Sequence, residues 1–129
     1  MSRNLEELKW ENRVLLVFAS GGNDDTLERQ LVAFREAEPD LKERDLIVFI
    51  LPAGEHGSCE GNPLPPGRAQ ALREDFGVPA EEFAVVLVGK DGGEKKRWGD
   101  YAPIPEIKDV IDAMPMRQRE MQTRREEAP

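Results

Sequence analysis

Residues 14–19 read Val14-Leu-Leu-Val-Phe-Ala19, an unbroken apolar run that is followed by Ser20-Gly-Gly-Asn23 and then by Asp24-Asp-Thr26. An apolar run without alternation predicts a strand covered on both faces, and the glycine break before acidic residues predicts the start of a helix. Leu46-Ile-Val-Phe-Ile-Leu51 is a second run of the same kind. A strand, a helix and a strand in this order favour a right-handed crossover between two parallel strands.

The rest of the pattern completes a series of short elements. We expect a helix with Leu27, Leu31 and Phe34 on its buried face, which ends at Pro39 and Asp40. A loop over Pro52–Gly67 and a short helix closed by Gly77 follow the second strand. The last elements are a buried strand over Phe83–Val88, a turn at Asp91-Gly92-Gly93, a polar strand over Glu94–Trp98 and a helix opened by Pro103 and Pro105.

This order of elements resembles the minimal thioredoxin-like arrangement, which has a parallel first half and an antiparallel second half. The resemblance implies an α/β fold with a four-stranded mixed sheet (β-α-β-α-β-β-α) flanked by helices. Residues 1–114 are expected to form this single domain, and residues 115–129, rich in Arg and Glu, are expected to form a charged helical tail.

Four motifs sharpen the likeness. They are Leu8-Lys-Trp-Glu-Asn-Arg-Val-Leu-Leu-Val-Phe-Ala19, Glu43-Arg-Asp-Leu46, Val88-Gly-Lys-Asp-Gly-Gly93 and Ile111-Asp-Ala-Met-Pro-Met-Arg117. Through them the chain resembles a bacterial domain family of unknown function, which is itself similar to repeats in vertebrate extracellular-matrix proteins of the sushi-repeat type. The resemblance implies a thioredoxin-like fold without an assigned activity.

Composition excludes several classes of function. The chain of 129 residues carries 18 Lys and Arg against 26 Asp and Glu, a net charge of -8. This balance argues against nucleic-acid binding, because phosphate contacts need a concentrated positive surface. The apolar runs are too short to span a bilayer, so we expect no membrane segment. One cysteine and one histidine leave no internal disulfide and too few ligands for a Cys/His metal site, so we expect neither a metal nor another cofactor.

The position at which a thioredoxin-like enzyme would carry its redox cysteine holds no cysteine in this sequence. A thioredoxin-like oxidoreductase carries its nucleophilic cysteine at the start of the helix after the first buried strand. Here that place reads Ser20-Gly-Gly-Asn-Asp-Asp25, and Glu81-Glu-Phe-Ala84 stands where the resemblance implies a cis-proline. We therefore expect no dithiol exchange. The glycines could present amides to an anion, but acidic capping of the helix is the favoured interpretation.

Cys59 offers an alternative function. With His56 three residues earlier in a Gly-rich loop, it could serve a single-cysteine thiol peroxidase or a redox sensor. The acidic neighbours Glu55 and Glu60 disfavour a thiolate, and no activating cation is near in the sequence.

Positive charge gathers around the predicted hairpin at Lys90, Lys95, Lys96 and Arg97. At a sheet edge such charge discourages pairing with other chains, and it could also dock an acidic partner. Trp98 and Tyr101 offer aromatic anchors beside it, or they pack against the last helix. Asp109 and Asp112 of that helix are expected on a solvated face.

We thus expect a non-catalytic thioredoxin-like module that binds a protein or assembles with itself. The candidate binding residues are Lys95, Lys96, Arg97, Trp98 and Tyr101, with the helical tail as a second candidate surface. The first residues lack the features of a secretory signal, which predicts a cytoplasmic location; removal of a signal peptide would instead place the chain in the periplasm or outside the cell.

Overall fold

A six-stranded mixed sheet forms the centre of the fold in the computed structural model, which describes residues 5–20 and 24–127. The order across the sheet is β4-β3-β2-β1-β5-β6. β1 (Arg13–Ala19) runs parallel to β2 (Leu46–Pro52) and antiparallel to β5 (Ala84–Val88), and β6 (Glu94–Trp98) lies outside β5. The three apolar runs are therefore the central strands, as the sequence predicts.

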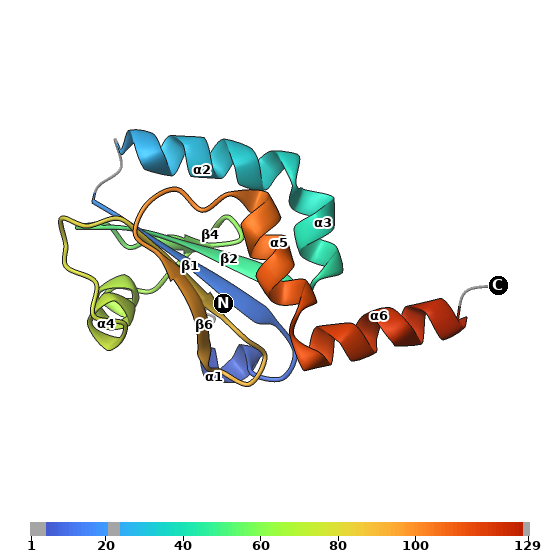
Figure 1. Cartoon of the computed structure of the whole chain (residues 1–129). Coiled ribbons are helices and arrows are strands. Elements are labelled where there is room, and N and C mark those ends of the chain that lie inside the picture. The colour runs from blue at the N-terminus through green and yellow to red at the C-terminus, as the bar shows by residue number, and fades with distance from the viewer. Residues whose placement is uncertain (1–4, 21–23, 128–129) are drawn as a thin grey trace.

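Helices cover both faces of the sheet (Figure 1). α2 (Asp25–Glu36), α3 (Glu38–Glu43) and α5 (Ile104–Asp112) lie on one face, and α1 (Leu5–Leu8) and α4 (Arg68–Asp75) lie on the other. α6 (Pro115–Glu127) follows α5 and extends away from the body of the domain. Within residues 5–20 and 24–127, no helix combines the length and the apolar character needed to cross a bilayer.

Alternate side chains of β1 belong to two separate cores. Leu16 and Phe18 pack in the core beneath α1 and α4, whereas Leu15 and Val17 pack in the core beneath α2, α3 and α5. All four side chains are fully buried. A strand buried on both faces needs no polar alternation, which explains the unbroken apolar run.

The predicted number of strands is wrong, because the segment expected as a loop contains a small hairpin. β3 (Ser58–Cys59) pairs antiparallel with the edge of β2 and with β4 (Asn62–Pro63). Glu60 and Gly61 form the two-residue connection with φ of 51° and 83°. Positive φ at both positions is the geometry of a tight hairpin turn, and glutamate is an unusual residue for it. The turn therefore gave no recognisable signal in the sequence.

Pro39 begins a helix instead of ending one. α2 ends at Glu36, and Pro39 stands in the first turn of α3, where a missing backbone N–H leaves no hydrogen bond unmade. The boundaries expected for α4, β6 and α5 agree with the structure to within one or two residues, and Gly77 has the expected positive φ of 66°.

A buried glutamine joins α2 to the segment before α5. Gln30 is fully buried; its Nε2 donates to the Ala102 carbonyl at 2.9 Å and its Oε1 accepts from the Ala102 amide at 2.7 Å. The side chain thus completes both backbone hydrogen bonds of a residue that is itself fully buried.

We predict that Gln30→Met lowers the free energy of unfolding by about 2–4 kcal/mol, because it leaves the buried N–H and C=O of Ala102 without partners. Urea denaturation measures the change. Gln70→Met, on the exposed face of α4, is the control and should stay within about 0.5 kcal/mol of the wild type. Equal stability of the two variants would contradict the role given to Gln30.

Candidate functional site

The end of β1 where a thioredoxin-like enzyme carries its cysteine is occupied by a capping network. Asp24 accepts hydrogen bonds from the Ser20 hydroxyl at 2.9 Å and from the backbone amides of Thr26 and Leu27 at 2.8 and 3.2 Å. Partial burial opposes ionisation of Asp24, but these hydrogen bonds outweigh it and lower the pKa of the carboxyl. The expected capping is confirmed at Asp24; Gly21–Asn23, the glycine turn considered for anion binding, lie outside the described residues.

A buried arginine fills the same end of the sheet from the other face. Arg73 of α4 donates to the carbonyl of Ala19, the last residue of β1, at 2.8 Å and to that of Leu51, the last residue but one of β2, at 3.1 Å. It also donates to the Pro79 carbonyl at 2.7 Å. Its guanidinium lies 5.3 Å from the centre of the Phe18 ring. Burial lowers the pKa of Arg73. The side chain ties the ends of β1 and β2 to the loop before β5, which is a structural role.

Cys59 and His56 lie in different surroundings. Cys59 is 3% exposed on β3, where it packs in the core beneath α1 and α4 and pairs in register with Phe49. His56 is exposed in the turn before β3 and lines an open hollow with Glu55 and Ser58. The only thiol of the chain is therefore covered, whereas reactive cysteines are partly exposed in electropositive surroundings.

The predicted binding residues on the hairpin are mostly engaged within the domain. Lys95 pairs with Asp91 at 2.8 Å, Arg97 pairs with Glu94 at 2.9 Å, and Lys96 lies on the exposed strand with its Nζ 5.8 Å from the Trp98 ring.

The two aromatic residues of that patch are also in use. Trp98 is buried and donates from Nε1 to Glu106 at 3.2 Å, and Tyr101 is half-buried with the Arg29 guanidinium 4.8 Å from its ring. Their packing against the helices was the alternative interpretation of these residues.

Buried charges gather instead at the opposite end of the sheet, around the start of β1. We call this group the α6 ion cluster; it consists of Arg13, Glu43, Arg44, Asp45, Lys90, Asp112, Arg117 and Glu120. Its four cations are all buried, although such side chains are seldom buried in proteins unless they are paired. The cluster joins four parts of the chain that are distant in sequence, at residues 13, 43–45, 90 and 112–120.

Glu120 of α6 stands at the centre of the cluster. Its carboxylate accepts from both terminal nitrogens of Arg13 at 3.3 Å and from Lys90 Nζ at 2.7 Å. Lys90 also pairs with Asp45 at 2.9 Å. Burial opposes ionisation of Glu120, but Lys90 and Arg13 outweigh this effect and lower the pKa of the carboxyl. Lys90 therefore does not belong to the exposed cations of the hairpin, contrary to the sequence interpretation.

Arg117 makes the second attachment of α6. It is 1% exposed and donates from Nε to Asp112 at 3.0 Å and from Nη2 to Glu43 at 3.2 Å. Asp112 also receives two hydrogen bonds from Arg44, at 3.0 and 2.8 Å. Burial opposes ionisation of Asp112, yet the two arginines lower its pKa. The expectation of a solvated face is wrong for Asp112, and the first turns of the tail helix are held against the domain.

An apolar cavity of about 520 Å³ opens beside the cluster; we call it the α6 pocket. Its apolar walls include Val110, Met114 and Met116, and Trp10 stands at its rim with 61% of its surface exposed. The Trp10 backbone N–H donates to the Lys90 carbonyl at 2.6 Å with φ at 73°, and the Nζ of the neighbouring Lys9 lies 5.9 Å from the centre of the indole ring.

The cluster also explains what the four sequence motifs share. All of its members except Glu120 belong to one of those motifs, and the motifs meet at this end of the sheet. The sequence signal was therefore present in the form of the resemblance. What no pattern indicated is that these charged residues are partners of one another.

Comparison with known proteins agrees with this reading of the motifs. The family described as "Domain of unknown function (DUF4174)" matches residues 4–120. The chain belongs to this family. The match ends at Glu120, so the part of α6 that carries the ion cluster lies within the DUF4174 domain.

Relatives of the DUF4174 domain include the sushi repeat-containing protein SRPX of Rattus norvegicus, which is 30% identical over 117 residues. The alignment covers 87% of this chain, and the chain spans 25% of the length of that relative.

Solved structures show the same fold. Reduced 2-Cys peroxiredoxin of Plasmodium vivax superposes with a TM-score of 0.73 at 17% identity, over 91% of this chain and 72% of the other. The exposed lipoprotein thioredoxin of Streptococcus pneumoniae gives a TM-score of 0.58 at 14% identity, over 85% of this chain and 90% of the other. The DUF4174 domain thus has a thioredoxin- or peroxiredoxin-like fold, with a single buried cysteine and no disulfide pair.

Over the described ranges, 5–20 and 24–127, no three His, Cys, Asp or Glu side chains are grouped so as to hold a metal ion.

We predict that acid weakens the attachment of α6. Glu120 and Asp112 have lowered pKa values in the folded domain, so their stabilising effect is full above the ordinary carboxyl range and is lost as the pH falls below about 4. Glu120→Gln should lower stability near neutral pH by about 1–3 kcal/mol and make the loss in acid shallower. Urea denaturation across this pH range measures both effects.

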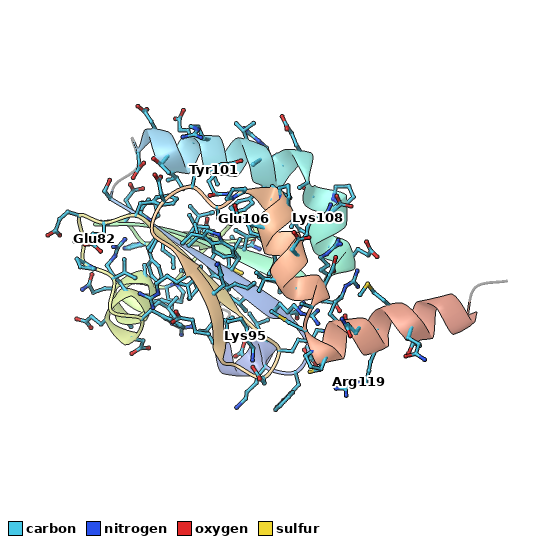
Figure 2. All side chains as sticks on the ribbon, in the orientation of Figure 1. Glu82, Lys95, Tyr101, Glu106, Lys108 and Arg119 are labelled. Carbon is cyan, nitrogen blue, oxygen red and sulfur yellow. The ribbon has the colours of Figure 1, made fainter. Side chains whose placement is uncertain are left out.

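Glu82→Gln is the matched control, because Glu82 is exposed at the end of the domain opposite Lys95 and Arg119 (Figure 2). This variant should keep the neutral stability and the steep acid loss of the wild type. An acid profile of Glu120→Gln that parallels the wild type would show that Glu120 does not hold α6.

Proposed function

We propose that this domain is a non-catalytic thioredoxin-like module that binds a protein through the surface formed by Trp10 and the α6 pocket. The proposal combines the fold, the covered thiol and an exposed aromatic residue beside an apolar cavity. It keeps the function expected from the sequence and moves the aromatic anchor from Trp98 and Tyr101 to Trp10.

The exposed indole of Trp10 is the observation that carries this proposal. A single exposed apolar residue is common on a protein surface, but Trp10 lines an apolar cavity, and apolar grooves on a surface mark interaction sites. Tryptophan is also enriched at the centres of protein interfaces. For a bulky residue, a φ of 73° is unfavourable by roughly 1 kcal/mol or more, so contacts with the surrounding chain must hold Trp10 in this conformation. Strained residues of this kind are concentrated at binding and active sites.

The surroundings of Trp10 support the same assignment. The pocket behind it is lined by apolar side chains of α5 and α6, into which a partner could insert a side chain. Lys95 belongs both to this lining and to the basic patch expected from the sequence, so the patch and the pocket form one continuous surface.

Thiol chemistry has little support in the geometry. A peroxidase or a redox sensor needs a thiol that its oxidant can reach, and Cys59 is covered by the core on the α4 side. The redox end of the sheet is occupied by Asp24 as a cap and by Arg73, which binds backbone carbonyls. The likeness to peroxiredoxin and thioredoxin structures concerns the fold alone.

We predict that Cys59 in the native domain reacts with a disulfide reagent at least about 100-fold more slowly than in the unfolded chain, because reaction requires local opening. Absorbance of the released thiol measures the rate. The control is Ser20→Cys in a Cys59→Ser background, which puts a thiol at the exposed end of β1 and should react quickly. Rapid labelling of native Cys59, with fast oxidation by peroxide, would favour the thiol enzyme instead.

We predict that a photoreactive phenylalanine analogue at Trp10 forms a discrete covalent adduct with a protein when the chain is irradiated in its host cells. The same analogue at Val32 is the matched control, because Val32 is also a large exposed apolar residue but lies on α2. An adduct of twice the chain mass would identify a second copy as the partner. No adduct from position 10, or the same adducts from both positions, would refute binding at this surface.

A further inference from the structure

The charged residues that line the α6 pocket are mostly cationic. They are Arg13, Lys90 and Lys95 against a single carboxylate, Asp91, in a chain whose net charge is -8. Asp91 is paired with Lys95 at 2.8 Å. The two buried cations, Arg13 and Lys90, are therefore neutralised from outside the lining, mainly by Glu120.

Arg13 and Lys90 share that one carboxylate. Glu120 lies within 3.3 Å of Arg13 and 2.7 Å of Lys90, and Lys90 has a second partner in the half-buried Asp45. Arg13 is fully buried, and among the described residues its Nε has no hydrogen-bond partner. A buried guanidinium N–H without an acceptor lowers stability, and an additional anion nearby would reduce this cost.

The walls of the pocket are chemically different from its charged side. Val110 of α5, Met114 between α5 and α6, and Met116 of α6 give an apolar surface, and methionine adapts its shape to irregular ligands. A volume of about 520 Å³ lies in the range of small-ligand sites and admits a bulky apolar side chain. Apolar walls beside buried cations fit a group that is apolar at one end and anionic at the other.

We propose that the α6 pocket takes a bulky apolar side chain of the partner together with a carboxylate next to it in the partner's chain. The apolar group lies against Trp10, Met114 and Met116, and the carboxylate is held by the field of Lys95, Lys90 and Arg13. This inference rests on the proposed function and adds the chemistry that the partner must present. Glu120 already supplies such a carboxylate from within the chain, so it competes with the partner's anion.

Two fluorescent probes of the same ring system test the proposal on the purified full chain. Anilinonaphthalene sulfonate carries an anion that stands in for the carboxylate, and phenylnaphthylamine is its uncharged counterpart. We expect the wild type to bind the sulfonate roughly tenfold more tightly than the neutral probe. Lys95→Gln should weaken the sulfonate by roughly threefold to tenfold and leave the neutral probe unchanged.

Lys108→Gln is the matched control, because Lys108 is a similarly exposed lysine that pairs with Asp40 on another part of the surface (Figure 2). It should change neither affinity. Glu120→Gln should tighten binding of the sulfonate, since it leaves Arg13 without a carboxylate partner and Lys90 with Asp45 alone. Unchanged binding of the neutral probe would show that the apolar walls remain.

Equal affinities of the two probes, or equal effects of Lys95→Gln and Lys108→Gln, would overturn the anionic part of the proposal. Failure of both probes to bind would overturn the assignment of the pocket. Neither result depends on the adducts formed at Trp10, so protein binding by this surface is judged separately by the cross-linking experiment.

Discussion

The carboxylate of Glu120 lies between two buried cations, and the position of α6 depends on it. Arg13 stands at the start of the central strand and Lys90 follows β5, so a single side chain of the last helix holds both. Removing one partner of such a group leaves a buried charge without compensation, which is far more costly than losing an exposed ion pair. The α6 pocket, with the exposed Trp10 among its lining residues, opens beside this group.

The sequence predicted the central strands and their parallel start because an apolar run has few other stable arrangements. Val14–Ala19, Leu46–Leu51 and the core of β5 are each too apolar to lie at a surface. The hairpin of β3 and β4 was missed because Glu60 precedes Gly61 in its turn, and the positive φ of this glutamate is set by the surrounding chain. Local composition determines the strands that are buried, and tertiary contacts determine the short strands at the edge.

Predictions of individual side chains were less reliable, since they depend on what each residue meets in three dimensions. Asp112 is predicted on the side of its helix away from the apolar residues and therefore in solvent, but Arg44 approaches it from the segment before β2 and Arg117 from α6. Conversely, Trp10 is exposed although its backbone N–H is hydrogen-bonded to the Lys90 carbonyl, and nothing local in the sequence predicts this placement. Pairs of charges that are distant in sequence have no local signature.

The anchored first turns of α6 also determine the direction of the turns beyond them. A helix of 13 residues is about 20 Å long, and its axis is fixed at one end by Arg117 and Glu120. Any polypeptide joined after the helix would start at a defined distance and bearing from the sheet, as on a rigid arm. Protonation of the Glu120 and Asp112 carboxyls would remove this fixed direction, because the ion pairs through which these two groups hold α6 against the domain would be lost.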